Sequence, residues 1–394
     1  MNTDNSKNPI LSKNVSSSNG LEPKLRFCNF KDGYCKKTLG STCNITTGKL
    51  DANAMVEGGA YRFYTCAREF YYNDNFAFAT DALLISGNGA NVGYIHHYCG
   101  KFNAYQRTYV LDQFDDNIMF VYYYLEANLH PRIAAEKKAG NTPYIVLSTL
   151  SKMSMWVPAS PEQKKIAEFL SLVDERIEQQ RQLVEALKRY KRGLFISIYS
   201  ANYSHWHQAK IRDYSKALGG YAFDSKSYND DGIYKVITIG NVSGNKYIDT
   251  SNTNKVPEIP TDMQPHQILQ NGDIVISMTG NVGRVSVVNQ LNCLLNQRVA
   301  KLDIKDVLVK EYIYQVLSNS DFEQEMNNVG QGAAQKNIKN TDIENYVFYI
   351  PQTDQHIETF TTILKKLDEN IMHQDMIYFM LKRTKQALLQ QMFI

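Results

Sequence analysis

Apolar residues recur at alternating spacings of four and three in two long stretches of the chain. The first stretch has nine positions at these spacings, of which seven are apolar: Ile166, Leu170, Val173, Ile177, Gln180, Val184, Leu187, Lys191 and Leu194. The second repeats them 194 residues later: Phe360, Leu364, Leu367, Ile371, Gln374, Tyr378, Leu381, Lys385 and Leu388. Four heptads in register are typical of a coiled coil, so these positions form a predicted helix-helix seam. At about 1.5 Å per residue, each helix is on the order of 55 Å long. The alternative is that each helix packs only on its own domain.

The polar seam positions predict the direction of the pair. In a parallel arrangement Lys191 faces Lys385, which places two like charges in one apolar layer. In an antiparallel arrangement each lysine meets a leucine instead. Gln180 and Gln374 are the middle of the nine layers in their helices, so they face each other in either case. We therefore predict an antiparallel pair, with one globular domain at each end and a pseudo-two-fold axis between them.

The segments before the helices also match each other. Residues 34–48 match residues 206–220 at an offset of 172, and residues 81–93 match residues 273–283 at an offset of 190 to 192. The helices match at 194, so the second copy has about 20 extra residues between its first two landmarks. The repeat predicts two similar domains, each followed by a long helix.

These patterns predict an α+β protein with two tandem globular α/β domains, two long helices in an antiparallel coiled coil, and a pseudo-two-fold internal repeat. The predicted segments are a flexible tail over 1–25, a first domain over 26–157, a central helix over 158–200, a second domain over 201–350 and a final helix over 351–394.

Composition narrows the class further. The net charge is only +3 and the mean hydropathy is −0.40, which favours a soluble globular chain over a uniformly basic coat protein. The first 20 residues are polar, and the sequence has no apolar run of the roughly 18 residues that a membrane span needs. We expect a cytoplasmic protein. Six scattered cysteines without paired zinc-ligand spacing predict free thiols and no metal site.

The sequence offers little that predicts catalysis. Residues 87–93 resemble a dinucleotide fingerprint but have one residue too many, and the second copy lacks the first glycine. Residues 141–144 (Asn-Thr-Pro-Tyr) resemble the Asn-Pro-Pro-Tyr loop of adenine methyltransferases, without an accompanying cofactor-binding glycine motif. We expect no active site in this chain.

The remaining motifs suit recognition. Residues 273–288 predict a strand, a tight turn and a second strand, and Gly280 and Gly283 allow positive φ or close approach of another molecule. The stretch 330–338 combines glycines with a lysine suited to phosphates or base edges. For the residues of 273–288, the alternative is an ordinary hairpin without a contact role.

The order of motifs resembles the specificity subunit of type I restriction-modification enzymes over nearly the whole chain. The motifs are residues 23–27 (Pro-Lys-Leu-Arg-Phe), residues 161–167 (Pro-Glu-Gln-Lys-Lys-Ile-Ala), and a long helix ending at residues 187–195, followed by the second copy. Residues 272–283 and 335–338 (Gln-Lys-Asn-Ile) look like that family's target-recognition pattern. The first copy departs from it, because residues 81–93 carry an insertion and no clear Gln-Lys-Asn-Ile equivalent is found near Asn141.

The resemblance implies that each domain, as a target recognition domain, binds one half of a split, asymmetric DNA site through the major groove, while the helices set the spacing. It also implies two methyltransferase subunits on the helices and two restriction/translocase subunits in the full complex. S-adenosylmethionine, ATP and Mg belong to those partners, and this chain holds no cofactor. The candidate DNA-contact residues are Lys101, Tyr105, Arg107, Thr279, Asn281, Arg284, Gln335, Lys336 and Asn337.

Two other interpretations remain. A non-enzymatic scaffold whose duplicated domains bind protein is supported by the small net charge, since many DNA-binding proteins are basic. A piece of a fused restriction-methylation enzyme is less favoured, because both ends look complete.

Overall fold

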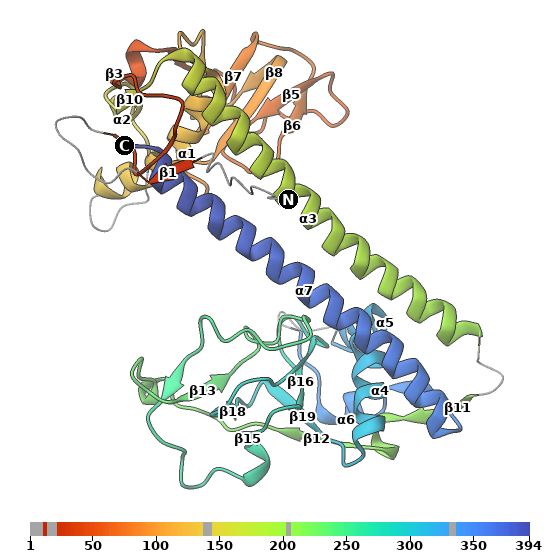
Figure 1. Cartoon of the computed structure of the whole chain (residues 1–394). Helices are drawn as coiled ribbons and strands as arrows, with labels where there is room; N and C mark the ends of the chain where they lie inside the picture. Colours follow the sequence, from red (N-terminus) through yellow and green to blue (C-terminus); the bar gives the residue numbers. More distant parts are fainter. Residues whose placement is uncertain (1–10, 14–21, 137–143, 202–205, 331–335) are drawn as a thin grey trace, which may run out of the picture. The chain divides into compact units, whose positions relative to one another are not determined.

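The computed structural model describes residues 11–13, 22–136, 144–201, 206–330 and 336–394. Contacts divide the chain into two compact units (Figure 1). Unit 1 comprises Met1–Arg181 and Met376–Ile394, and unit 2 comprises Gln182–Asp375. Each unit therefore contains a globular part together with one end of each long helix.

Unit 1 is built on a six-stranded sheet in the order β4-β9-β7-β8-β5-β6. Its strands are β4 (Asn44–Thr47), β5 (Tyr61–Tyr64), β6 (Tyr71–Asn73), β7 (Phe78–Ser86), β8 (Ile95–Ala104) and β9 (Thr108–Asp112). All neighbours are antiparallel except β5 and β8, which run parallel. The strands of this unit outside the sheet form two antiparallel pairs, β1 (Leu11–Lys13) with β2 (Leu25–Phe27) and β3 (Cys35–Thr38) with β10 (Ser154–Val157). Strand β1 lies within the segment for which we predicted a flexible tail.

The sheet of unit 1 curls back on itself. Phe102 pairs with Phe78 at one end of β7, and only six residues later Thr108 pairs with Ser86 at the other end. The last residue of β8, Ala104, lies against Gly48. A Cβ added to Gly48 would lie 1.9 Å from the Ala104 carbonyl oxygen. Gly220, its match in the repeat, would meet the Asn296 carbonyl oxygen at 2.2 Å. The shared glycine is therefore explained by a close backbone crossing that admits no side chain.

Helix α1 (Ile118–Glu136) covers one face of this sheet. Buried Phe120, Leu125 and Leu129 of α1 join Leu83 and Leu111 of the sheet in one core. The short helices among the described residues of unit 1 are η1 (Leu39–Ser41) and α2 (Leu147–Ser151).

Unit 2 repeats this plan with different strands. Strand β11 (Trp206–Lys210) pairs with β20 (Val347–Pro351), as β3 pairs with β10. Two four-stranded sheets have the orders β12-β19-β16-β17 and β14-β13-β18-β15. Their strands are β12 (Lys216–Gly219), β13 (Tyr234–Ile237), β14 (Lys255–Val256), β15 (Ile268–Leu269), β16 (Ile274–Ser277), β17 (Val285–Val287), β18 (Cys293–Leu295) and β19 (Val299–Asp303). Strands β13 and β18 run parallel, as β5 and β8 do in unit 1.

Besides its parts of the two long helices, unit 2 has several short helices among its described residues. They are η3 (Ile211–Asp213), η4 (Ser225–Ser227), η5 (Pro265–Gln267), α4 (Val307–Leu317), α5 (Ser320–Val329) and α6 (Asn340–Glu344). The second copy is longer in the segments that connect β13 to β14 and β14 to β15, which explains the change in offset. The predicted fold class, two similar mixed α and β domains with long helices, is confirmed.

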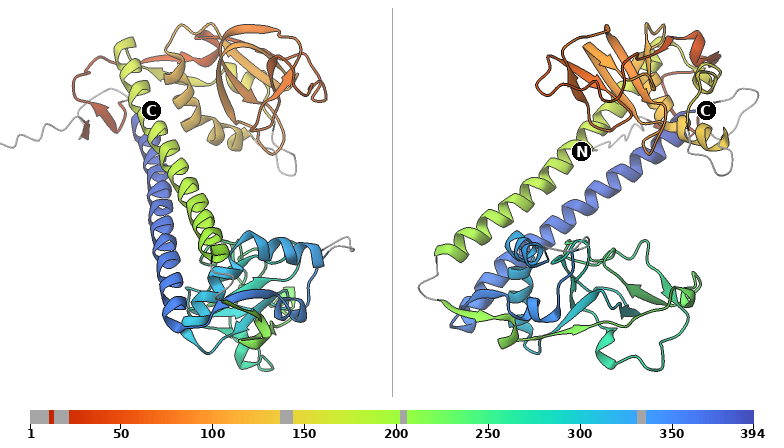
Figure 2. Two further views of the ribbon diagram at one scale, coloured as in Figure 1. Left: turned by 90° about the vertical axis from the view of Figure 1, so that its right-hand side faces the viewer. Right: turned by 180° about the vertical axis from the view of Figure 1, so that it is seen from behind.

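The long helices are α3 (Ser160–Ala201) and α7 (Asp354–Met392). In unit 1, Ile166 and Leu170 near the start of α3 share a core with Leu389 and Met392 at the end of α7. In unit 2, the Phe195 ring near the end of α3 lies 5.6 Å from the Phe360 ring near the start of α7. Within each unit the helix ends lie side by side in opposite directions (Figures 1 and 2), which confirms the predicted antiparallel direction. No helix among the described residues is long and apolar enough to cross a membrane.

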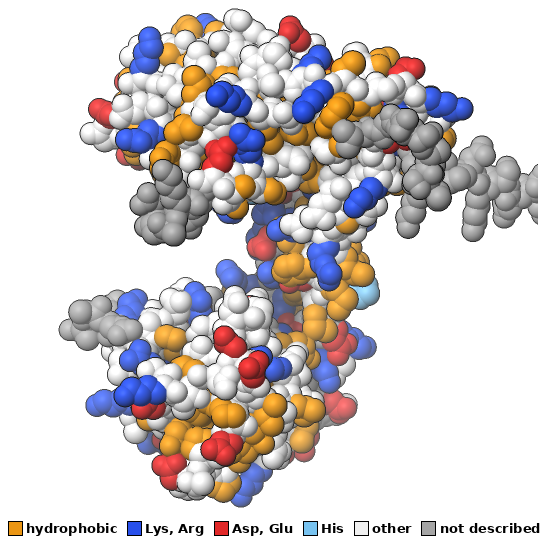
Figure 3. All heavy atoms as spheres, turned by 90° about the vertical axis from the view of Figure 1, so that its left-hand side faces the viewer, with side chains coloured by type: hydrophobic (Ala, Val, Ile, Leu, Met, Phe, Trp, Pro, Cys, Tyr) orange, Lys and Arg blue, Asp and Glu red, His pale blue; other side chains and the backbone are white. Residues whose placement is uncertain are grey.

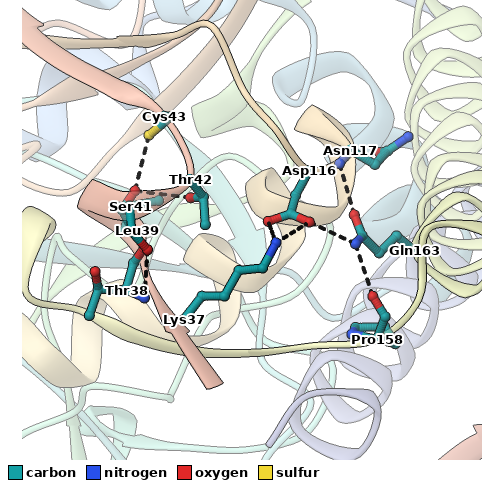
Figure 4. Close-up of polar contacts among 10 residues, drawn as sticks. All are labelled: Lys37, Thr38, Leu39, Ser41, Thr42, Cys43, Asp116, Asn117, Pro158 and Gln163. Carbon is teal, nitrogen blue, oxygen red and sulfur yellow. Dashed lines mark hydrogen bonds and ion pairs between the residues drawn. The ribbon is translucent and has the colours of Figure 1, made fainter. Parts of the chain in front are cut away.

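The start of α3 is fixed to the globular part of unit 1 by buried polar contacts. The Arg26 guanidinium makes two bonds of 2.8 Å to the Glu162 carboxylate, and these side chains are 4% and 1% exposed. Beside them, Gln163 donates to Asp116 and to the Pro158 carbonyl oxygen (Figure 4). Lys37 from β3 reaches the same Asp116 carboxylate at 2.8 Å. The first turn of α3 is therefore held in one orientation on its domain.

Candidate nucleic-acid interface

Two loops of unit 2 meet at the end of strand β16. The predicted hairpin is confirmed, since β16 and β17 pair antiparallel on either side of the turn. The Gly280 amide donates to the Lys336 carbonyl oxygen at 3.0 Å, and the Ile338 amide donates to the Met278 carbonyl oxygen at 3.0 Å. The hairpin turn and residues 336–338 therefore form one surface, which we call the unit 2 loop pair.

Glycine at the end of the hairpin turn has a structural reason. Gly283 has φ +80°, and an added Cβ would lie 2.8 Å from Met326 of α5. In unit 1, Gly93 has φ +82° and would approach Ile133 of α1 at 2.8 Å. Each turn thus packs directly on a helix in a conformation that disfavours any side chain.

Unit 1 has a matching surface, the unit 1 loop pair, formed by the turn after β7 and residues 144–145. The Gly87 amide donates to the Arg107 carbonyl oxygen at 2.9 Å, as Met278 does to Arg298 at the same distance. The Ile145 amide donates to the Gly87 carbonyl oxygen at 2.8 Å. A bridge between Asn88 and Tyr144 corresponds to the bridge between Thr279 and Asn337.

This correspondence corrects one expectation. We found no equivalent of Gln-Lys-Asn-Ile near Asn141, but Tyr144 and Ile145 take the structural places of Asn337 and Ile338. The sequence comparison of the two copies missed this correspondence, because of the two positions only the isoleucine (Ile145 and Ile338) is the same. The end of the Asn-Thr-Pro-Tyr motif is thus part of the unit 1 loop pair, while its first three residues lie outside the described ranges.

The predicted contact residues of unit 2 differ in their exposure. Thr279 is 9% exposed, and its hydroxyl donates to the Asn337 side-chain oxygen at 3.1 Å. Asn281, Lys336 and Asn337 are exposed, and the Lys336 ammonium donates to Asn327 of α5 at 2.8 Å. Arg284 is half-buried and lies 3.4 Å from Glu323. The sixth predicted residue, Gln335, lies outside the described residues.

The structure brings together only part of the predicted set in unit 1. Arg107 is exposed and lines a cleft of about 260 Å³ with Gln106, Tyr109 and Tyr144, among others. Tyr105 is half-buried, with its amide bonded to the Tyr64 carbonyl oxygen. Lys101 is exposed on β8, its ammonium 4.7 Å from the centre of the Phe76 ring, and it does not line this cleft.

Two residues of the unit 1 cleft were not among the predicted contacts. Tyr144 is 61% exposed, so its ring is available for stacking. The Tyr109 hydroxyl donates to the Ile145 carbonyl oxygen at 3.0 Å, and burial raises the pKa of Tyr109, so this hydroxyl stays a donor. Neither residue could be predicted as a contact residue from the sequence, because the hydrogen bonds that position residues 144–145 join residues 36 or more positions apart.

The face of the molecule in Figure 3 has no large field of one charge sign. On the face in Figure 3, basic and acidic side chains are interspersed over each unit, in keeping with the net charge of +3. Any attraction for phosphates therefore depends on local groups such as Lys336 and Arg107.

All eighteen predicted seam positions are buried or half-buried, and none is exposed. We expected each of the two seam lysines to meet a leucine, but each also has an acidic partner. Lys191 lies 2.6 Å from Asp368 in unit 2, and Lys385 lies 2.7 Å from Asp174 in unit 1. The internal repeat relates these two ion pairs, because Lys385 follows Lys191 by 194 residues and Asp368 follows Asp174 by 194 residues.

An aromatic ring accompanies each ion pair. The Lys191 ammonium lies 5.9 Å from the Tyr314 ring centre, and the Lys385 ammonium lies 5.3 Å from the Tyr123 ring centre. Burial lowers the pKa of Lys191, and Asp368 opposes that effect. The repeated Asp-Glu dipeptides at 174–175 and 368–369 were visible in the sequence as landmarks, but their role as lysine partners was not.

Comparison with known proteins identifies the family. The family model described as "Type I restriction modification DNA specificity domain" matches residues 31–189 and again residues 203–377. The chain belongs to this family. Its two matched segments contain the unit 1 and unit 2 loop pairs.

Similar proteins in the family differ in how much they share with this chain. The EcoDI specificity subunit of Escherichia coli is 36% identical over 160 residues, which is 40% of this chain and 35% of that protein. The MjaVIII specificity subunit of Methanocaldococcus jannaschii is 22% identical over 348 residues, covering 82% of this chain and 79% of that protein. The solved S subunit of a type I system from M. genitalium has the same fold, with a TM-score of 0.60 at 18% identity over 95% of this chain and 99% of that one.

Proposed function

We propose that this chain is the DNA-recognition subunit of a type I restriction-modification complex and has no catalytic activity of its own. The observation that carries the proposal is the repeated loop pair. Units 1 and 2 present the same arrangement of hairpin turn and following loop, but with different side chains. Two related surfaces with different residues suit two DNA half-sites of different sequence.

Each loop pair contacts one half-site in the major groove. Lys336 and Arg107 bind phosphates or guanine edges, and Asn337 and Asn281 offer amide groups to adenine. A good bidentate contact contributes about 1–3 kcal/mol of discrimination between bases. Because Thr279 is buried and bonded to Asn337, its role is to orient the Asn337 amide.

The helices set the distance between the half-sites and bind the partners. We propose two methyltransferase subunits along α3 and α7, and two restriction/translocase subunits in the full complex. S-adenosylmethionine, ATP and Mg act in those partners, and the proposed location is the cytoplasm. That Gln180 and Gln374 face each other between the helices stays a prediction. The domain boundaries at residues 25, 157, 200 and 350 also stay predictions.

The salt dependence of DNA binding tests this function against the protein-binding scaffold, which the near-neutral charge favours. Affinity of the full chain, in complex with its methyltransferase, is measured for random duplex DNA at increasing salt. A DNA-recognition subunit shows affinity that falls linearly with salt on logarithmic axes. A complex that forms normally but shows no salt-dependent DNA binding would favour the scaffold.

A further inference from the structure

Unit 2 contains a cleft that none of the predicted DNA-contact residues lines. Its volume is about 410 Å³, within the usual range of about 300–1,000 Å³ for small-molecule sites. It lies between the end of α3, the middle of α7, the junction of α4 and α5, and the loop at 244–247.

The cleft has an excess of positive charge. Its basic lining residues are Lys188, Lys191, Arg192 and Lys246, and its acidic lining residues are Asp368 and Asp375. The buried Asp368 carboxylate receives both deep lysines, Lys191 at 2.6 Å and Lys246 at 3.5 Å. Glu311, which does not line the cleft, lies 3.7 Å from Lys246. Counting Glu311 still leaves four cations against three carboxylates.

Gln315 points to a ligand more directly. It is 1% exposed, and its amide nitrogen donates to Glu311 at 2.9 Å and Asp368 at 2.8 Å. Carboxylates only accept hydrogen bonds, so the nitrogen must face them and the amide oxygen must point the other way. That oxygen is buried and has no hydrogen-bond partner among the described residues. A buried acceptor of this kind needs a hydrogen-bond donor, which a bound ligand or a water supplies.

Asn319 supplies the complementary group. Its side-chain oxygen accepts from the Ser320 amide at 2.8 Å, which fixes the direction of the side chain. Its amide nitrogen is buried and has no partner within the described part of the chain. The cleft therefore contains an unused donor and an unused acceptor beside an excess of cations.

We propose that this cleft binds a small phosphorylated molecule that carries hydroxyl or amino donors, of the nucleotide class. The phosphate interacts with Arg192, Lys188 and the Asn319 amide, and a ligand hydroxyl or amine donates to Gln315. The half-buried Tyr247 provides aromatic surface for a base. Because Lys191 and Lys246 are only 17% and 14% exposed, a small ligand reaches them more readily than the bulky backbone of a duplex.

The lysine at the corresponding place in unit 1 has more acidic partners. Lys385 there pairs with two carboxylates, Asp174 and Glu126, both at 2.7 Å. Burial raises the pKa of Glu126, and Lys385 opposes that effect. Here one lysine pairs with two carboxylates, whereas in unit 2 two lysines, Lys191 and Lys246, pair with two carboxylates, Asp368 and Glu311. We therefore expect AMP to bind in unit 2 and not at this position.

The test is calorimetric titration of the full chain with AMP, adenosine and inorganic phosphate. We expect saturable binding of AMP at one site, weaker binding of phosphate, and none of adenosine. The variant N319D keeps the oxygen that accepts from Ser320 but replaces the free amide with a repelling carboxylate. It should weaken AMP binding about tenfold or more, as should R192A together with K188A. The control K164A, at an exposed position of α3 in unit 1, should leave binding unchanged.

Three results would overturn the proposal: no saturable AMP binding at millimolar concentration, AMP binding that N319D leaves intact, or displacement of AMP by random duplex DNA. The last would assign the phosphate to DNA. DNA affinity of the same samples is measured in parallel, so that loss of the nucleotide site is distinguished from failure of the proposed recognition function.

Discussion

Single residues decide how firmly the first domain is attached to its helix. Arg26 and Glu162 are both almost fully buried, so each charge depends on the other for compensation. Removing one partner of such a pair leaves an uncompensated buried charge, which is more damaging than removing both. Both residues lie in motifs that carried the family resemblance, at 23–27 and 161–167, but the sequence did not predict that they pair, because they are 136 positions apart.

We predict that Glu162→Ala lowers the free energy of unfolding of unit 1 by about 3–5 kcal/mol. Urea denaturation followed by circular dichroism measures the change. Lys164→Ala, two residues away with a side chain 73% exposed, is the control and should change stability by less than about 0.5 kcal/mol. Equal stabilities of the two variants would show that the Arg26 pair does not hold the helix.

At the DNA surface, Arg284→Ala should weaken binding and reduce the salt slope by about 1 if the guanidinium contacts a phosphate. Fluorescence anisotropy with duplex DNA over a range of salt measures both quantities. Arg212→Ala, at an exposed position of η3, serves as the control. Unchanged affinity and slope would remove Arg284 from the contact surface.

At the scale of elements, the long helices were the most predictable part of the fold. Nine seam positions in each helix give a repeated pattern, and the long helices α3 (Ser160–Ala201) and α7 (Asp354–Met392) contain all of them. The antiparallel direction followed from avoiding a Lys191–Lys385 layer, but the structure adds attraction, since each lysine meets an aspartate. Those partners, and the place of Tyr144 beside Asn88, depend on long-range contacts that no local pattern encodes.

The antiparallel direction gives a disulfide prediction. Ile166→Cys with Leu388→Cys should form a cross-link under mild oxidation, because both side chains belong to the same core of unit 1. Ile166→Cys with Phe360→Cys should remain reduced. Non-reducing gel electrophoresis compares the two, and efficient linking of the second pair alone would contradict the arrangement.

At the scale of the whole molecule, the chain is a duplication whose halves keep the same framework and differ in their loops. Unit 1 has one curled six-stranded sheet, whereas unit 2 divides its strands between two four-stranded sheets after an insertion of about 20 residues. The framework was predictable from the repeat, while the identity of the contacted bases is not encoded in any pattern that we found.

The most direct test of the central claim is a map of adenine methylation in a host that expresses the partner methyltransferase with this chain. We predict a split, asymmetric motif that depends on the chain, and exchange of residues 26–157 for those of another family member should change one half of the motif and leave the other half and its spacing intact. No chain-dependent motif, in the presence of a soluble complex with the methyltransferase, would contradict a role in DNA recognition.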